Sequence, residues 1–162
     1  MGGSRSAELG ISARTLTLRI SDLAVPSALG SQDLAATARR FHERQLEDRP
    51  DRIAALIHED AEMTLLANYL RTLRGRRSIM AALARGREAE IYQAEVEQCE
   101  LLSRDILFVR GQARYALDDS GVGVSRVWWL DEFRDGLLWR VEAFRMEQAA
   151  LDAYASRLAA MV

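Results

Sequence analysis

Residues 106–154 read ILFVRGQARYALDDSGVGVSRVWWLDEFRDGLLWRVEAFRMEQAALDAY, and this stretch decides the fold. It predicts three successive strands and then a helix that begins at Glu147. The strands are expected at Ile106–Leu117, Val122–Phe133 and Leu137–Met146. Turn-forming residues separate them, Asp118-Asp119-Ser120-Gly121 first and Arg134-Asp135-Gly136 second. Because short turns join antiparallel neighbours, the stretch predicts a meander with one face available to a layer of helices.

Helical patterns precede this meander. Ser31 is a suitable cap for a helix whose apolar side chains Leu34, Ala38 and Phe41 share one face. Pro50 suits the first turn of a second, shorter helix. The remaining predicted elements are a strand through residues 63–66, a helix over about residues 76–87 that Gly86 ends, and a strand at Tyr92–Leu102.

Composition limits the classes of function. The 162 residues are 49% hydrophobic and 28% charged with a net charge of −2, which predicts one soluble domain. Without a basic field, nucleic acid is not an expected partner. No apolar run approaches the roughly eighteen residues that a membrane span needs. Cys99 is the single cysteine and is expected to be a small buried hydrophobe, so a reducing cytoplasm is the expected compartment.

The first thirty residues differ from the rest of the chain. Leu16, Leu18 and Ile20 alternate with Thr15, Thr17 and Arg19, as they would in a short half-buried strand. Pro26 and Gly30 follow before the first helix. We therefore expect residues 1–30 to be a loosely attached extension that adds an edge strand or a dimer contact, and residues 31–162 to be the domain.

Three local features together resemble one known family. His58-Glu59-Asp60-Ala61 precedes a predicted strand, Leu73-Arg74-Gly75-Arg76 precedes a predicted helix, and the last strand runs into the helix at Glu147. Over about residues 31–161 the sequence resembles the SnoaL-like members of the nuclear transport factor two-like superfamily, relatives of polyketide cyclases, steroid isomerases and epoxide hydrolases. The resemblance implies an α+β cone, in which a curved antiparallel sheet packs against about three helices, plus a C-terminal helix. It also implies an internal pocket for a small hydrophobic molecule.

The alternation of the last strand leaves open which of its faces lines the pocket. One parity holds Glu142 and the other holds Val141. The resemblance favours Glu142, because epoxide hydrolases of the superfamily carry an acidic residue at the matching place, and it puts Arg114 or Gln112 in the cavity as well. Glu142 is then the expected catalytic base. The alternative is that Glu142 forms a salt bridge with Arg114 or Arg126 that only neutralises buried charge.

Polar residues elsewhere suggest further pocket positions. Asn68 and Tyr69 follow the first predicted strand, where the superfamily places pocket-mouth residues, and Tyr69 is the expected hydrogen-bond donor to a ligand. The alternative is a loop tyrosine that packs over the next helix. His42 neighbours the apolar face of the first helix, and it either points into the cone or is a packing residue. The arginine–aspartate pair of the epoxide hydrolases is absent, since Gln112 and Arg114 stand at those positions.

Adjacent tryptophans on one strand face opposite sides. One of Trp128 and Trp129 should therefore line the cavity, and the other should face a subunit interface. Trp128 is taken as a ligand-binding candidate. The resemblance implies a homodimer built by stacking the outer sheet faces. The sequence has no nucleotide-binding motif and no metal-ligand spacing, so no cofactor and no metal are expected.

Two functions follow from these features, and the residues leave open whether the chain is an enzyme. The first is a SnoaL-like protein that binds a small hydrophobic ligand and catalyses isomerase, cyclase or hydrolase type proton transfer. The second is a non-catalytic ligand-binding or dimerisation module. An inward, unpaired Glu142 would favour the first function, whereas a Glu142 engaged by arginine would favour the second.

Overall fold

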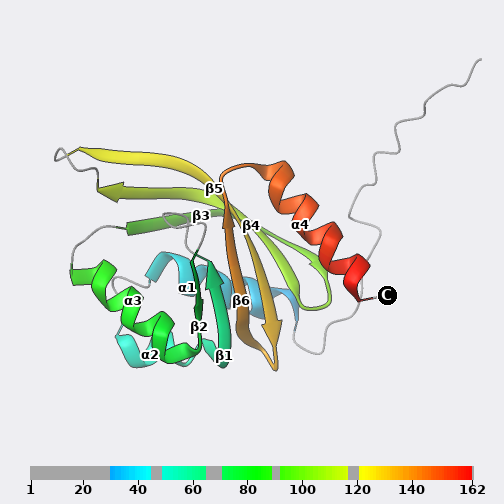
Figure 1. The fold of residues 1–162 in the computed structure, drawn as a ribbon, viewed down its shortest axis with the longest axis horizontal. Coiled ribbons are helices and arrows are strands. Elements are labelled where there is room, and N and C mark those ends of the chain that lie inside the picture. Colours follow the sequence, from blue (N-terminus) through cyan, green and yellow to red (C-terminus); the bar gives the residue numbers. More distant parts are fainter. Residues whose placement is uncertain (1–29, 45–48, 65–70, 89–91, 117–120, 162) are drawn as a thin grey trace, which may run out of the picture.

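A computed structural model of the chain describes residues 30–44, 49–64, 71–88, 92–116 and 121–161 (Figure 1). Within these ranges the protein is α+β, with four helices and one curved, open six-stranded sheet. In chain order the elements are α1 (Ser31–Arg44), α2 (Pro50–Ala54), β1 (Ile57–Thr64), β2 (Thr72–Arg74), α3 (Arg76–Glu88), β3 (Tyr92–Ser103), β4 (Ile106–Ala116), β5 (Val122–Arg134), β6 (Leu137–Phe144) and α4 (Glu147–Ala160). The α+β fold class predicted from the sequence is confirmed.

The strands follow the order β2-β1-β6-β5-β4-β3. Strands β3 to β6 form the predicted antiparallel meander, and β2 pairs antiparallel with β1. The pairing of β1 with β6 is parallel, so the expectation of a purely antiparallel sheet is wrong at this one ladder. The short strand β2 was not predicted, because three residues are too few to show a period of two.

Local chemistry accounts for several element boundaries. Asp135 and Gly136 both have positive φ, 52° and 78°, as the two central residues of a type I′ hairpin turn require. Pro50 is the first residue of α2, where its missing N–H costs nothing. The helix α3 continues two residues beyond Gly86, so the prediction that this glycine ends the helix is wrong.

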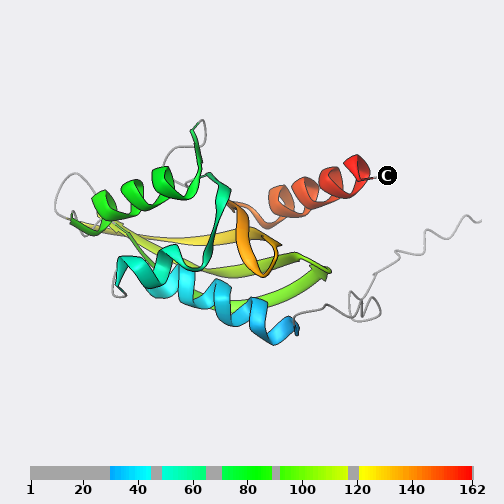
Figure 2. The same ribbon diagram turned by 90° about the horizontal axis from the view of Figure 1, so that it is seen from below.

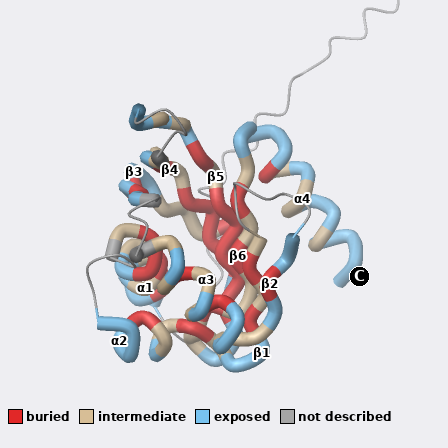
Figure 3. The backbone as a smooth tube through the Cα atoms, turned by 60° about the vertical axis from the view of Figure 1, so that its left-hand side comes forward, coloured by how far each residue is buried: buried red, intermediate tan, exposed pale blue. Residues whose placement is uncertain are grey.

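Helices cover both faces of the sheet. Figure 2 shows α1 and α4 on opposite sides of the sheet. We call the face toward α1 the inner face, and its core joins buried residues of α1, α2 and α3 to the sheet, among them Phe41, Ile53 and Ile79. The opposite, outer face carries a second core, in which Phe108 and Leu130 pack against Ala150 of α4. Figure 3 shows the buried residues gathered along the middle of β5 and β6.

A register irregularity in β6 decides which of its side chains face inward. Phe133 pairs with Leu138, but the preceding residue, Glu132, pairs with Arg140, so Trp139 is an extra residue in the ladder. Such a bulge reverses the alternation of the strand. Leu138 therefore belongs to the inner core together with Val141 and Ala143, although their sequence parity differs.

Some predictions fall outside the described residues. These include the expected roles of Asn68 and Tyr69 and the extension over residues 1–29. None of the helices that the structure describes is long and apolar enough to cross a membrane.

Candidate functional site

The inner core contains a buried histidine and a buried aspartate in direct contact. His42 Nε2 donates a hydrogen bond of 2.8 Å to Asp131 Oδ2. The two side chains are only 1% and 0% exposed. The sequence analysis left open whether His42 points into the cone or is a packing residue, and the structure shows its side chain buried in the inner core. We call His42 and Asp131 the interior pair.

Aromatic rings surround the imidazole of this pair. The ring of Trp129 lies 4.5 Å from that of His42, centroid to centroid, at an interplanar angle of 34°. The Phe41 ring lies 5.1 Å away and meets the imidazole edge-on. Such packing fixes the orientation of the imidazole against the carboxylate of Asp131.

The second oxygen of Asp131 is the unusual atom of the site. Oδ1 is buried and has no hydrogen-bond partner in the described part of the chain. A buried carboxylate oxygen without a partner is costly, and in native structures it calls for an explanation. An acceptor that can receive a hydrogen bond from a ligand or a water is one such explanation.

Sequence reasoning missed Asp131 altogether. The available signal was its position in Val127–Phe133, where an acidic residue interrupts an apolar strand. Strand alternation places it on the same face as Trp129 and Phe133, two residues away on either side. The contact with His42 could not be inferred, because it joins a helix to a strand 89 positions away.

Glu142 does not lie with the interior pair. Its Oε2 accepts a hydrogen bond of 2.5 Å from Nη2 of Arg157 on α4, on the outer face of the sheet. The expectation that its parity lines the inner cavity is wrong, because the bulge at Trp139 reverses the alternation. Its expected partners, Arg114 and Arg126, are replaced by Arg157. The catalytic role expected of Glu142 stays a prediction, and the geometry does not favour it. A Glu142 engaged by arginine is the arrangement that the sequence analysis linked to the second function, so a case for catalysis has to rest on other residues.

Gln112 and Arg114 also lie on the outer face. Their neighbours on β4, Gly111 and Ala113, are buried toward the inner core, so the intervening side chains point the other way. Gln112 Nε2 donates a 2.8 Å hydrogen bond to Glu97 Oε1, and Arg114 is exposed. Their expected place in the internal cavity is therefore wrong.

The two adjacent tryptophans face opposite sides, as predicted. Trp129 is the inward one, and it is 2% exposed. Trp128 packs with the outer core under α4, so its assignment to an inner pocket is wrong. Its indole Nε1 is buried without a hydrogen-bond partner among the described residues. The choice between them follows from the docking of α1 on one face and α4 on the other.

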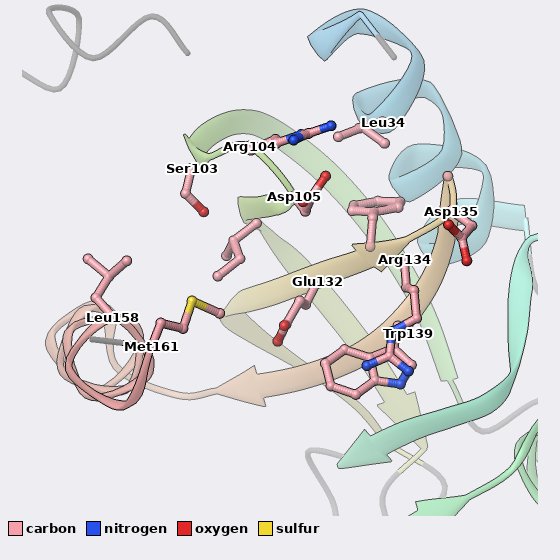
Figure 4. A pocket seen from close by; sticks show the side chains of 13 residues that line it. Leu34, Ser103, Arg104, Asp105, Glu132, Arg134, Asp135, Trp139, Leu158 and Met161 are labelled. Atoms are coloured by element: carbon pink, nitrogen blue, oxygen red, sulfur yellow. The ribbon is translucent and has the colours of Figure 1, made fainter. Parts of the chain in front are cut away.

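A cavity lies at the end of the sheet where the β3–β4 and β5–β6 turns meet (Figure 4). Its volume is about 560 Å³, and its walls also include Leu34 of α1 together with Leu158 and Met161 at the end of α4. We call it the end groove. Trp139 lines it, with the guanidinium of Arg134 3.8 Å from the centre of its ring. The sequence analysis gave no indication of this groove.

Two further observations bear on reactive groups. Burial raises the pKa of the Cys99 thiol from 9.0 to about 11, so the side chain is a poor nucleophile at neutral pH. In the described part of the chain, no three His, Cys, Asp or Glu side chains gather closely enough to hold a metal ion.

Comparisons with known proteins find similarity in structure but not in sequence. No family model and no curated protein matches the chain. Among solved structures, the chain resembles the epoxide hydrolase/cyclase-like enzyme SalBIII of pyran ring formation in the polyether salinomycin, with a TM-score of 0.61 and 12% identity over 74% of this chain and 95% of the other.

Two further examples each have a TM-score of 0.58. One is named as a candidate SnoaL-like polyketide cyclase from Jannaschia sp. CCS1, with 15% identity over 75% of this chain and 91% of the other. The other is an NTF2-like protein of unknown function from Burkholderia pseudomallei, with 14% identity over 74% and 95%. Identities this low establish a shared fold and leave the activity to be argued from the site. The chain therefore has the nuclear transport factor two-like fold, as the resemblance in its sequence predicted.

Proposed function

We propose that this chain is a SnoaL-like protein that binds a small hydrophobic molecule inside the cone and catalyses a proton transfer on it through the interior pair. The observation that carries the proposal is the geometry of Asp131. One of its oxygens is held by His42 at 2.8 Å, and the other is buried and unpartnered within the described residues. In a carboxylate held in this way, one oxygen is fixed and the other keeps an unused capacity to accept a hydrogen bond.

The two residues have different roles in this proposal. His42 is the positioning residue, because its Nε2–H fixes Oδ2 and so orients the carboxylate. Asp131 is the catalytic base: its Oδ1 accepts a proton from an activated C–H group or from a water molecule, and later returns the proton to the product. Isomerisation, cyclisation and hydration all require such a step. A positioned acid or base typically contributes a factor of about 10² to 10⁴ in rate.

The surroundings favour a hydrophobic substrate. The inner core around the pair consists of aromatic and aliphatic side chains, among them Trp129, Val109 and Val127. Water is excluded from such an environment, and electrostatic interactions in it are stronger than in solvent. The neighbours named for polyketide cyclisation and epoxide chemistry support a carbonyl compound or an epoxide as the ligand class.

We propose that the chain forms a homodimer whose interface uses only part of the outer face of the sheet. The helix α4 covers part of the outer face, so stacking of whole outer faces is not available. The outward side chains near the start of β5 are uncovered, and Val122 and Val124 are 70% and 58% exposed. Exposed β-branched residues on a sheet face suit contact with a second copy.

The first experiment screens the purified chain for thermal stabilisation by small hydrophobic ketones, epoxides and polyketide-like aromatics. A ligand that binds only the folded state must raise the melting temperature. Carbonyl hits are then incubated in D₂O, and exchange of their acidic C–H protons is followed by NMR. Epoxide hits are followed by diol formation. We expect one chemical class to give a saturable shift and a reaction faster than in buffer alone.

Two isosteric variants assign the base. Asp131→Asn should slow the reaction about 100-fold or more while the ligand still raises the melting temperature. Glu142→Gln is the matched control, because it removes the other candidate carboxylate on the opposite face, and it should react at the wild-type rate. An Asp131→Asn variant with wild-type turnover would contradict the proposal, and so would a library in which no compound stabilises the chain.

A further inference from the structure

The interior pair is closed off from solvent. His42 and Asp131 are 1% and 0% exposed, so a ligand reaches the carboxylate of Asp131 only when a neighbouring side chain moves aside. The proposed function therefore requires an entrance that opens. Such an entrance is expected where a hollow in the surface comes close to the pair with few side chains between them.

The end groove meets the inner core at Phe133. This residue lines the groove and also belongs to the inner core, and it is only 4% exposed. Phe133 and Asp131 are two positions apart on β5 and face the same side, so their Cβ atoms are about 7 Å apart. Along this face of β5, the ring of Phe133 therefore lies between the groove and the carboxylate of the pair.

The helix α1 forms the other side of this boundary. Leu34 lines the groove, belongs to the inner core and is 2% exposed (Figure 4). His42 follows on the same helix, about 12 Å further along its axis. Ala38, midway between them, is a small and fully buried residue. The groove and the pair thus follow one another between α1 and β5, with Leu34 and Phe133 at the boundary.

The ring of Phe133 can move while its strand stays in place. The backbone N–H of Phe133 donates a 2.8 Å hydrogen bond to the carbonyl oxygen of Asp105, which holds the strand at this point. Rotation about χ1 takes a side chain from one staggered position to another without breaking such a backbone bond. The groove beside the ring has a volume of about 560 Å³, which leaves space for a ring that turns outward.

The charges along the groove suit an uncharged ligand. The two turns contribute four charged residues of balanced sign, Arg104, Asp105, Arg134 and Asp135. Among the described residues that line the groove, Glu132 is the other charged one, and Arg140 and Arg157 lie 3.4 and 3.7 Å from its carboxylate. A rim with balanced charges does not attract ions of one sign. The volume is in the usual range for small-molecule sites.

We propose that the end groove is the entrance to the interior pair and that Phe133 is its gate. When the ring swings aside, a small uncharged ligand passes from the groove, between Leu34 and β5, to the carboxylate of Asp131. The width of this opening then determines which substrates react. The inference rests on the proposed function for its ligand, but the opening itself can be measured without one.

The test follows the access of acrylamide, a small uncharged quencher, to Trp129. Its ring packs on His42 and is 2% exposed. Trp128→Phe and Trp139→Phe leave Trp129 as the single tryptophan of the full-length chain. Quenching of its fluorescence then reports how often the core opens. In this background Phe133→Leu should increase the quenching rate constant about fivefold, because a smaller side chain closes the boundary less completely.

Phe108→Leu is the matched control. Phe108 is 5% exposed and so equally buried, but it belongs to the outer core on the opposite face of the sheet. This variant should keep the quenching rate constant within about a factor of two of the background. Urea denaturation of both variants checks that they lose similar stability, and Phe133→Met repeats the measurement if the leucine variant does not fold. Equal quenching in the Phe133 and Phe108 variants would overturn the proposal.

Turnover gives a second readout that separates this inference from the proposed function. For a compound that reacts, Phe133→Leu should raise kcat/KM of a bulkier analogue relative to the parent compound about tenfold, because the route has widened. Phe108→Leu should leave this ratio unchanged. A ratio that neither variant changes would overturn the entrance and leave the role of Asp131 intact. A chain that turns over no compound would contradict the proposed function, whereas the quenching experiment would still test the gate.

Discussion

His42 on α1 and Asp131 on β5 are 89 positions apart in the sequence, and their side chains meet at 2.8 Å in the inner core. A hydrogen bond between two buried polar groups stabilises the fold only while both partners are present. The contact therefore has a structural consequence that can be measured apart from any activity.

Removal of the Asp131 carboxylate should show this consequence. We expect Asp131→Ala to lower the free energy of unfolding by about 1–3 kcal/mol, because it deprives the buried imidazole N–H of its acceptor. Asp131→Asn keeps an acceptor oxygen and should cost less than half as much. Urea denaturation of the two variants measures the difference. Equal losses would show that the hydrogen bond with His42 contributes little.

The ion pairs of Arg157 should contribute more to stability than an ordinary surface ion pair does. Its side chain is 11% exposed and lies against Glu142 and Glu132 on the outer face. Arg157→Ala removes the cation between these carboxylates; Glu132 keeps Arg140, and Glu142 is 35% exposed, so we expect a loss of about 1–2 kcal/mol. Arg49→Ala is the control, since its pair with Asp51 is largely exposed and should contribute under about 0.5 kcal/mol. Thermal and urea unfolding of both variants measure the two losses of stability.

Gly111 is required by the close approach of β3. A Cβ at this position would lie 2.1 Å from the carbonyl oxygen of Glu95 and 3.1 Å from the Trp129 ring. We expect Gly111→Ala to destabilise the fold by about 2–3 kcal/mol, because backbone must move. Gly86→Ala in α3 meets no atom within 4 Å and should stabilise by about 0.5–1 kcal/mol. The two variants are expected to change stability in opposite directions. Urea denaturation of both therefore tests whether the cost at Gly111 comes from the close packing of β3 on β4.

The Cys99 thiol should react slowly with alkylating agents. It should also make the free energy of unfolding depend on pH in the alkaline range. Burial raises its pKa to about 11 from 9.0, so at pH 8 alkylation should be at least about 100-fold slower in the folded chain than in denaturant. Since the folded pKa is the higher one, this contribution to stability is complete below pH 9 and is lost as the pH rises from 9 toward 11. A Cys99→Ala variant should lack that part of the pH dependence. Rapid alkylation of the folded wild type would show that the thiol is accessible.

The proposed dimer contact should be sensitive to charge at the exposed end of β5. Light scattering of the wild type should give twice the chain mass of 18.2 kDa. Val124→Asp should give a monomer, because a charge opposite its own copy repels and is costly to desolvate. Met146→Asp changes another exposed apolar residue, at the start of α4, and should leave the dimer intact. A wild-type monomer would remove the dimer from the proposal.

Local sequence was sufficient for most of the fold. The hairpin at Asp135-Gly136 was predicted because both residues tolerate the positive φ that a two-residue turn needs. Pro50 and Glu147 begin their helices as expected, and the strand β4 ends one residue from its predicted end. These features depend on neighbours in the chain, so their chemistry is visible in the sequence.

The candidate site could not be derived in the same way. Both faces of β5 and β6 carry apolar side chains, because helices cover both faces, so a period of two identifies two faces without distinguishing them. Trp128 and Glu142 were assigned to the wrong face for this reason, and the bulge at Trp139 reversed the alternation as well.

The sequence by itself determined the order of helices and strands, the turns and the resemblance to the nuclear transport factor two-like fold, because each follows from short-range patterns. Only the tertiary structure decided that α1 covers one face of the sheet and α4 the other. That choice joins His42 to Asp131 and separates both from Glu142, which pairs with Arg157. The physical reason is that a contact between distant segments depends on how whole elements pack, and no local pattern encodes it.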